Sequence, residues 1–327
     1  MGPCSYVLPL RWSPDLDADE LAAYLRTLID RGQTDDVLVV DGSPEPHFSD
    51  LAERLPASVR HVRPAPDLDF ANGKVDGVIT GLRLARHDKV VVADDDVRYD
   101  GPDLACVAAA LDWADAVVPQ NYFRPMPWHA VWDTARTLLA RATGGDFPGT
   151  LGVRRDLLLG VGGYDGNVLF ENLELLRTVQ AAGGRVHRLN DCFVPRLPPT
   201  ARRFWSQRPR QAYDEWARPA RLAAALAVLP AVARVATSRR RTRIGAVLAF
   251  ATATMAAAEC GRRADGGTRV FPAVASLFAP VWVLERGVCA WLAVVQRLTG
   301  GCRYGGRRLT RAATPTPELA DRLAPAA

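Results

Sequence analysis

The sequence predicts an α/β protein with a mostly parallel central sheet, followed by a helical tail. Two observations predict the sheet: short apolar runs without polar alternation recur through the first half of the chain, and segments with helical spacing separate them. Such runs are typical of strands that helices cover on both faces. A third observation predicts the tail, because beyond residue 200 the chain consists mainly of longer apolar runs between arginine-rich stretches.

The elements of the first half follow one another in a regular order. Short apolar runs predict strands at residues 5–10, 37–40, 90–93 and 116–120. Apolar residues at helical spacing predict helices at residues 21–30, 76–85 and 104–114 and from Glu171 onward. Alternating strands and helices are the pattern of a parallel sheet with helices packed on it.

Composition and charge narrow the classes of function. The chain has 327 residues, 48% of them hydrophobic, which is enough for a large core. The formal net charge is only +5, but arginines gather after Arg196, next to apolar sequence. That placement favours an anionic membrane surface, so we expect no nucleic-acid partner. The start of the chain lacks the pattern of a signal peptide, so we expect the catalytic part to face the cytoplasm.

The tail leaves its relation to a membrane open. Its apolar runs lie at residues 221–236, 244–258, 270–284 and 287–295. Each is shorter than the roughly 20 residues that cross a bilayer squarely, and Glu285 and Arg286 interrupt the last two. A hairpin that crosses and returns and helices that lie in the interface are both consistent with this pattern. A small helical domain packed on the core is the alternative, and we expect membrane association.

This pattern predicts a division of the chain into parts. We expect a catalytic domain at residues 1–200, a basic interfacial segment at 201–219, a helical membrane-associated region at 220–310 and a flexible C-terminus at 311–327.

The strongest chemical signal is a run of three acids, Asp94, Asp95 and Asp96, directly after the strand at 90–93. Open α/β sheets place their ligands at the carboxyl ends of strands. Three adjacent carboxylates repel one another unless a cation or hydrogen-bond donors neutralise them. In an extended segment Asp94 and Asp96 point to the same side. They therefore predict a site for Mn²⁺ or Mg²⁺; an acidic turn that caps the next helix is the alternative.

An ordered series of motifs resembles the family 2 glycosyltransferases, which have the GT-A nucleotide-sugar-binding fold. Asp41 ends the strand at 37–40, where the family has its nucleoside-binding acid, although Asp-Gly is also a common turn. Asp94 and Asp96 match the family's Asp-x-Asp motif, and Lys74 stands in a segment similar to its Gly-Lys segment. The residues at 149–166 resemble the acceptor-side segment that ends in Gly-Gly-aromatic-Asp. The resemblance, over about residues 5–200, implies that Asp94 and Asp96 hold the metal and that Asp41, Lys74 and Asp95 bind the nucleotide sugar.

The sequence departs from this family at the expected catalytic base. The family usually has Glu-Asp at the start of a helix, whereas here Glu171 is followed by Asn172, whose amide cannot accept a proton. Glu171 is therefore the candidate base, with Asp165 and Glu174 as substitutes. Acids are also favoured near the positive end of a helix for structural reasons alone. The run Glu-Asn-Leu-Glu also resembles polypeptide N-acetylgalactosaminyltransferases, which retain the anomeric configuration, so inversion and retention both stay open.

A basic segment at 203–219 resembles the Gln-x-x-Arg-Trp motif of membrane glycosyltransferases, including ceramide glucosyltransferase-like enzymes. Gln207 and Arg210 match, whereas Gln211 stands in place of the tryptophan. The resemblance implies that Gln207 and Arg210 contact the donor, with Arg210 on its diphosphate. An interfacial basic helix is the alternative.

Together these features predict an enzyme that moves a sugar from a nucleotide-sugar donor to a hydroxyl acceptor, for which a lipid or lipid-linked molecule is one option. A catalytically inactive nucleotide-sugar-binding protein, favoured by Asn172, is the first alternative. A membrane-anchored interaction protein on the same fold is the second. We expect the protein at the cell membrane, with its catalytic domain in the cytoplasm.

Overall fold

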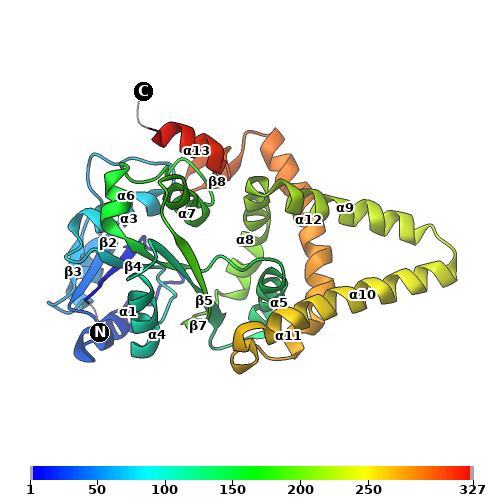
Figure 1. The fold of residues 1–327 in the computed structure, drawn as a ribbon, viewed down its shortest axis with the longest axis horizontal. Helices are drawn as coiled ribbons and strands as arrows, with labels where there is room; N and C mark the ends of the chain where they lie inside the picture. Colours follow the sequence, from blue (N-terminus) through cyan, green and yellow to red (C-terminus); the bar gives the residue numbers. More distant parts are fainter. Residues whose placement is uncertain (1–2, 325–327) are drawn as a thin grey trace.

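The computed structural model describes residues 3–324 and confirms an α/β core followed by a helical part (Figure 1). The core sheet has the strand order β3-β2-β1-β4-β6-β5-β7. Neighbouring strands are parallel except at β6, which is antiparallel to both β4 and β5. The strands are β1 (Ser5–Leu10), β2 (Asp36–Asp41), β3 (Arg60–Val62), β4 (Lys89–Ala93), β5 (Ala116–Phe123), β6 (Thr150–Arg154) and β7 (Val186–Arg196).

Helices cover both faces of this sheet, because alternate side chains of each strand point to opposite faces. One face packs against α1 (Ala18–Asp30), α2 (His47–Arg54) and α4 (Gly101–Ala110). The other face packs against α3 (Gly73–Leu84), α6 (Arg155–Gly160) and α7 (Glu171–Ala181).

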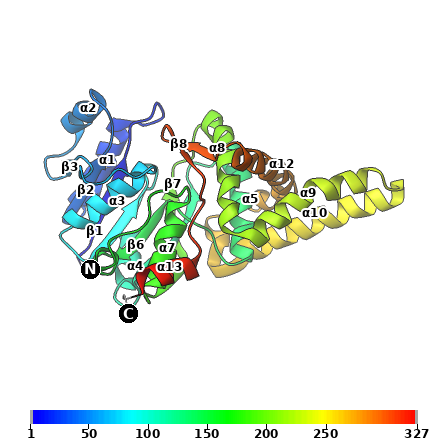
Figure 2. The same cartoon turned by 90° about the horizontal axis from the view of Figure 1, so that it is seen from above.

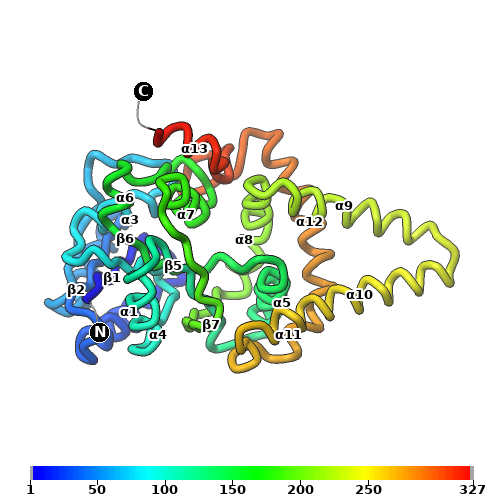
Figure 3. Tube along the Cα trace, viewed as in Figure 1, coloured from blue at the N-terminus to red at the C-terminus, as the bar shows by residue number. Residues whose placement is uncertain are grey.

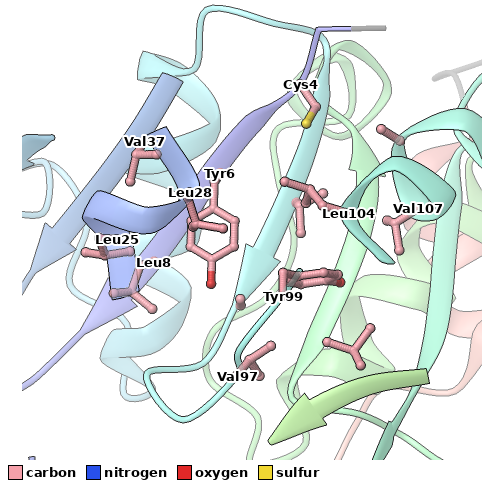
Figure 4. Close-up of a cluster of buried hydrophobic side chains, with 14 of the residues drawn as sticks. Cys4, Tyr6, Leu8, Leu25, Leu28, Val37, Val97, Tyr99, Leu104 and Val107 are labelled. Carbon is pink, nitrogen blue, oxygen red and sulfur yellow. The ribbon is translucent and has the colours of Figure 1, made fainter. Parts of the chain in front are cut away.

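Strand β1 illustrates this two-sided burial. Tyr6 and Leu8 belong to the cluster with α1, whereas Val7 belongs to the cluster with α3. Figure 4 shows the first cluster, in which Leu25 and Leu28 of α1 lie beside Tyr6 and Leu8. The continuous apolar run at β1 therefore reflects burial on both faces, as expected for a parallel sheet.

The strands and helices expected from the first half of the sequence are all present, with small shifts at their ends. The expectations omitted β3, α2, α5 (Trp128–Ala142), β6, α6 and β7. The edge strand β7 is only partly buried along most of its length, so it has no continuous apolar run to mark it. A partly buried strand has a weaker apolar pattern in its sequence than a strand that is buried on both faces.

The helical part packs against the core mainly through α5 and α8 (Ala201–Tyr213). Leu138 of α5 lies in one apolar cluster with Phe271 and with Trp282 of α12. The remaining elements of this part are η1 (Asp214–Ala217), α9 (Pro219–Ala236), α10 (Arg240–Arg263), η2 (Ala264–Arg269), α11 (Val274–Leu277) and α12 (Ala279–Leu298).

Two charged residues that were expected to interrupt an apolar run lie inside α12 instead. Glu285 is paired with Arg208 of α8 at 2.7 Å, and the side chain of Arg286 is buried. The pairing compensates the desolvation of Glu285, so the helix continues through this position.

Helices α9 and α10 form a hairpin that extends away from the body of the molecule (Figures 1 and 2). In residues 3–324, two helices are long and apolar enough to cross a membrane, Pro219–Ala236 and Arg240–Arg269, and only 11% of the apolar window of each is buried. Large apolar side chains on the hairpin are exposed, among them Val232, Ile244 and Leu248. This low burial disfavours the alternative of a helical domain packed on the core.

The C-terminal segment corrects an expectation. We expected a flexible end at 311–327, but the chain returns to the α/β core and forms α13 (Thr316–Leu323) beside α7 (Figure 3). A hairpin of β8 (Cys302–Tyr304) and β9 (Arg307–Leu309) precedes it. The backbone amide of Thr314 donates to the buried carboxylate of Glu174 at 2.6 Å. The expectation was therefore wrong for residues 311–324, and residues 325–327 lie outside the described part of the chain.

The close contact between α10 and α5 gives a prediction for stability. A Cβ at Gly261 would lie 1.9 Å from the carbonyl oxygen of Leu138, whereas a Cβ at Gly245, in the same helix, would meet nothing within 4 Å. Gly261→Ala should lower the free energy of unfolding by about 1–3 kcal/mol through overpacking. Gly245→Ala should raise it by up to about 1 kcal/mol through helix propensity. Thermal and denaturant unfolding of both variants measures this, and equal effects at the two positions would contradict the packing.

Candidate active site

A cleft of about 1400 Å³ lies at the carboxyl ends of β1 and β4. Its walls come from both parts of the chain, since residues of β1, α3, α8, α12 and the β8–β9 hairpin all line it. The three acids Asp94, Asp95 and Asp96 line it as well, directly after β4. The sheet therefore delivers these acids where open α/β folds place their ligands.

Two basic side chains neutralise the acids at the end of β4. The Nζ of Lys74, from the start of α3, lies 2.6 Å from Oδ1 of Asp94. Arg196, at the end of β7, places its Nε 2.8 Å from Oδ2 of Asp96 and its Nη2 3.6 Å from Oδ2 of Asp94. These ion pairs compensate the repulsion between neighbouring carboxylates.

The ionisation of the three acids follows from burial and from these cations. Burial raises the pKa of Asp94, but the charges of Lys74 and Arg196 outweigh it and hold that pKa below its usual value. Burial raises the pKa of Asp96, against the opposing charge of Arg196. Burial and the two neighbouring carboxylates raise the pKa of Asp95 to about 6.

The donor atoms of Asp94 and Asp96 fit a hard divalent cation. Oδ1 of Asp96 is buried, and no residue in 3–324 donates a hydrogen bond to it. Gly149 leaves Oδ2 of Asp94 clear, because a Cβ at this glycine would lie 2.6 Å from that oxygen. Within the described residues no group of three or more His, Cys, Asp or Glu side chains could hold a metal. Magnesium, however, is commonly held by one or two carboxylates together with substrate phosphates and water.

Glu171, the candidate base, lines the same cleft at the start of α7. Its Oε1 lies 2.8 Å from Nζ of Lys74, so this one ammonium group bridges Glu171 and Asp94. The next residue, Asn172, also lines the cleft, and its side-chain amide donates to the carbonyl of Pro148 at 3.0 Å. Lys74 therefore joins the candidate base to the acids of β4.

The two substitute bases do not lie with these residues. Glu174 is fully buried and accepts the hydrogen bond from Thr314, so it anchors the C-terminal return. Asp165 accepts a hydrogen bond from the amide of Asn167 at 2.8 Å, inside a turn. Neither is among the described residues that line the cleft. Helical position alone had nominated Glu174, but tertiary packing turns it away from the cleft.

Asp41, the expected nucleoside-binding acid, is buried behind the cleft wall. It accepts a hydrogen bond from the amide of Ser43 at 2.8 Å and lies 3.1 Å from Nε2 of His61. Burial raises the pKa of Asp41, but these partners bring it below its usual value. The neighbouring Gly42 lines the cleft, whereas Asp41 is absent from its described lining. Asp41 thus fixes the loop after β2.

The basic helix α8 forms another wall of the cleft. Gln207 and Arg210 both line it, and the guanidinium of Arg210 lies 5.1 Å from the centre of the Tyr304 ring. Asp214 follows in η1, where burial raises its pKa to about 7 against the opposing charge of Arg210. The sequence had placed Gln207 and Arg210 here by motif.

Arg196 and Asp214 were missed in the sequence. Arg196 stands at the end of an edge strand that the apolar pattern did not reveal. Asp214 lies four residues after Arg210 of the basic motif but is not part of any motif itself. Arg196 meets the segment after β4 through an isolated antiparallel bridge to Val97, a contact between distant parts of the chain that no local signal predicts. No local signal marks Asp214 either.

The raised pKa of Asp214 gives a pH prediction. Its pKa of about 7 in the folded protein exceeds the ordinary value of 3.8, so the native state binds the proton more tightly than the unfolded state. Stability should therefore fall as the pH rises from about 4 to above 7. The Asp214→Asn variant should lack this contribution. Its melting temperature should therefore decrease less between about pH 5 and about pH 8 than that of the wild type. The exposed Asp321 provides the control Asp321→Asn, which should melt like the wild type. If the melting temperatures of the wild type and of Asp214→Asn changed equally with pH, the result would contradict the burial of Asp214.

Comparison with solved structures finds related proteins of low sequence identity. Glucosyl-3-phosphoglycerate synthase from Mycobacterium tuberculosis, in complex with Mn²⁺, UDP and phosphoglyceric acid, is 20% identical and has a TM-score of 0.42; 62% of this chain and 73% of that chain are covered. A mycobacterial protein is 19% identical with a TM-score of 0.43, covering 62% of this chain and 70% of that chain. The same synthase with Mg²⁺ and UDP is 18% identical with a TM-score of 0.42, covering 62% and 73%. The bound metals and ligands are properties of those proteins.

Comparison with protein families finds a match in the α/β core. No curated protein matches the chain. Residues 16–169 match the family described as Glycosyl transferase family 2. The matched segment contains α1 to α6 and therefore includes Lys74 and the three acids after β4.

Proposed function

We propose that the protein is a glycosyltransferase that uses a nucleotide-sugar donor. The observation that carries the proposal is the pair Asp94 and Asp96 after β4, which line a large cleft and lie in the segment that matches Glycosyl transferase family 2. Lys74 and Arg196 hold this pair, so positive and negative groups alternate where a diphosphate would bind.

These ion pairs support a site in which the basic side chains move from the carboxylates to the donor when the donor binds. A diphosphate would attract Lys74, Arg196 and Arg210, which all line the cleft. Moving these cations to phosphate oxygens would leave Asp94 and Asp96 as ligands for Mn²⁺ or Mg²⁺. A bound divalent ion neutralises charge that develops on the departing diphosphate. Asp95 and Gln207 remain proposed contacts of the nucleotide sugar, whereas Asp41 would act by holding the loop at Gly42.

The same exchange would free the proposed base. Glu171 is paired with Lys74 before the donor binds. Once Lys74 turns to the diphosphate, the carboxylate of Glu171 can accept the proton of an acceptor hydroxyl. The stereochemical outcome stays open, because a retaining transferase needs no such base.

Asn172 favours a second candidate function, a nucleotide-sugar-binding protein without turnover. The amide side chain donates to the carbonyl of Pro148, so it orients the loop before β6 and cannot accept a proton. Measuring slow hydrolysis of nucleotide sugars separates the two candidates. Hydrolysis that Glu171→Gln abolishes supports the enzyme, and binding without any hydrolysis supports the second candidate.

The helical part supports a lipid or lipid-linked acceptor at a membrane. Exposed apolar side chains cover much of the α9–α10 hairpin, and arginines at 239–241 are exposed at its tip. Arginines beside apolar surface suit the interface of an anionic membrane, where the charges reach the head groups. We therefore place the hairpin in the interface of the cell membrane, with the catalytic domain on the cytoplasmic side.

Donor binding gives a prediction for the acids of β4. UDP or GDP with Mn²⁺ should raise the melting temperature of the wild type. Asp96→Asn should remove the Mn²⁺-dependent part of this rise and lower sugar transfer by about a hundredfold or more, because it removes preorganised charge stabilisation. Asp321→Asn, on exposed α13, is the matched control. Wild-type transfer rates in Asp96→Asn would contradict the metal assignment.

Membrane binding gives a prediction for the tip of the hairpin. Vesicles that contain anionic phosphatidylglycerol should bind the protein more tightly than vesicles of phosphatidylcholine alone. Replacing Arg239, Arg240 and Arg241 by serine should weaken that preference roughly a hundredfold, at about 1 kcal/mol for each arginine. A variant with serine at the exposed positions Arg26 and Arg31 controls for net charge. Equal vesicle binding by the two variants in co-sedimentation would count against the interfacial hairpin.

A further inference from the structure

Arg286 of α12 is a buried charge that forms no ion pair within residues 3–324. Its side chain lines the cleft although only 5% of the residue is exposed. Its Nε and Nη1 are buried and have no hydrogen-bond partner, and no ion pair to Arg286 is found in residues 3–324. A buried charge is normally paired or hydrogen-bonded, because its desolvation is otherwise uncompensated. The position therefore needs an explanation.

The acids nearest to Arg286 are committed to other arginines. Glu285 is held by Arg208 at 2.7 Å, and Glu215 lies 3.1 Å from Arg218. Burial and the positive charge of Arg208 lower the pKa of Arg286 to about 10, which still leaves the guanidinium charged at neutral pH. The protein thus retains a positive charge here without supplying its counter-ion.

Other donors at the same wall also lack partners. The Nε1 of Trp282 and the Nε of Arg218 are buried without a hydrogen-bond acceptor among the described residues, and both side chains line the cleft. The guanidinium of Arg286 lies 5.0 Å from the centre of the Trp282 ring. These three side chains therefore present several unpartnered N–H groups to the same cavity.

The acids around Arg286 leave its charge without an ion pair. Those that interact with its charge are Asp133, Asp214, Glu215 and Glu285. Asp133 and Glu285 are paired with Arg208, and Glu215 is paired with Arg218. Asp214 forms no ion pair within residues 3–324, and burial raises its pKa to about 7. A bound anion would therefore supply the counter-ion that Arg286 lacks in the described part of the chain.

We propose that Arg286 and Trp282 form a second anion-binding subsite of the cleft, which takes a phosphate group of the acceptor. A phosphate group offers several acceptor oxygens to converging N–H donors, and arginine matches it in geometry and charge. The assignment of this phosphate to the acceptor rests on the proposed function, whereas anion binding at Arg286 does not.

Either a soluble phosphoester or a phosphate-bearing lipid could supply this group. The outer face of α12 carries exposed apolar residues at helical spacing, Leu284, Val288, Trp291 and Val295. Arg286 faces the cleft from the same helix. A lipid could therefore place its phosphate in the cleft while its chains lie on the outer face.

Titration with inorganic phosphate tests the subsite. Arg286→Met should raise the melting temperature in phosphate-free buffer, because it replaces an unpaired buried charge by an apolar side chain. It should also weaken phosphate binding by at least about tenfold, while binding of UDP with Mn²⁺ stays as in the wild type. An unchanged phosphate affinity, or a lower melting temperature without phosphate, would overturn the proposal. Should UDP and Mn²⁺ fail to bind the wild type, the proposed function fails, but the phosphate comparison still decides the subsite.

Two further measurements complete the test. Wild-type crystals soaked in tungstate should show anomalous density within hydrogen-bond distance of Arg286. Anomalous density only at Lys74 and Arg196, or no such density, would overturn the subsite. This measurement uses the wild type, so it decides the question even if Arg286→Met does not fold. Vesicles of phosphatidylcholine with phosphatidic acid separate the two sources of phosphate. If Arg286→Met loses binding to these vesicles, the subsite takes a lipid phosphate. If Arg286→Met loses binding of inorganic phosphate but binds the vesicles like the wild type, the subsite takes a soluble phosphoester. Both results support the subsite.

Discussion

The neutralisation of Asp94 and Asp96 by Lys74 and Arg196 is the interaction on which the rest of the site depends. Adjacent acids at a strand end repel one another in a partly buried cleft, so the fold must supply cations or lose stability. It supplies them from the start of α3 and the end of β7, which ties three elements together at one edge of the sheet. The same cations are complementary to a diphosphate. Structural neutralisation and donor binding can therefore use the same side chains at different times.

A second set of buried ion pairs joins three helices of the helical part. Arg208 of α8 is bonded to Asp133 of α5 and to Glu285 of α12, each at 2.7 Å. Removing one partner would leave an uncompensated buried charge, so the three helices hold a fixed arrangement. The C-terminal return adds a further connection through Glu174. The cleft is thus built jointly by the two parts, and a substrate that fills it contacts both.

Much of the fold could be predicted from the sequence, because strands buried on both faces leave continuous apolar runs. The positions of Asp94 and Asp96 at a strand end likewise followed from local pattern. Arg196 could not be found in this way, since its role depends on a bridge between the end of β7 and Val97, which are distant in the chain. Glu174 was a substitute base because it lies close to Glu171 in the same helix, but its carboxylate accepts a hydrogen bond from a segment 140 residues later in the chain. Local pattern identifies candidate groups, and only tertiary structure shows which of them meet.

The most direct test of this account is electron paramagnetic resonance of Mn²⁺ added to the protein with a nucleoside diphosphate. The account predicts that UDP or GDP increases Mn²⁺ binding in the wild type, and that Asp94→Asn and Asp96→Asn each abolish the increase. It also predicts that Lys74→Met weakens binding of the diphosphate. Mn²⁺ binding that is independent of the nucleotide, or unchanged when both aspartates are replaced, would contradict the claim that these carboxylates and a donor diphosphate share one cation.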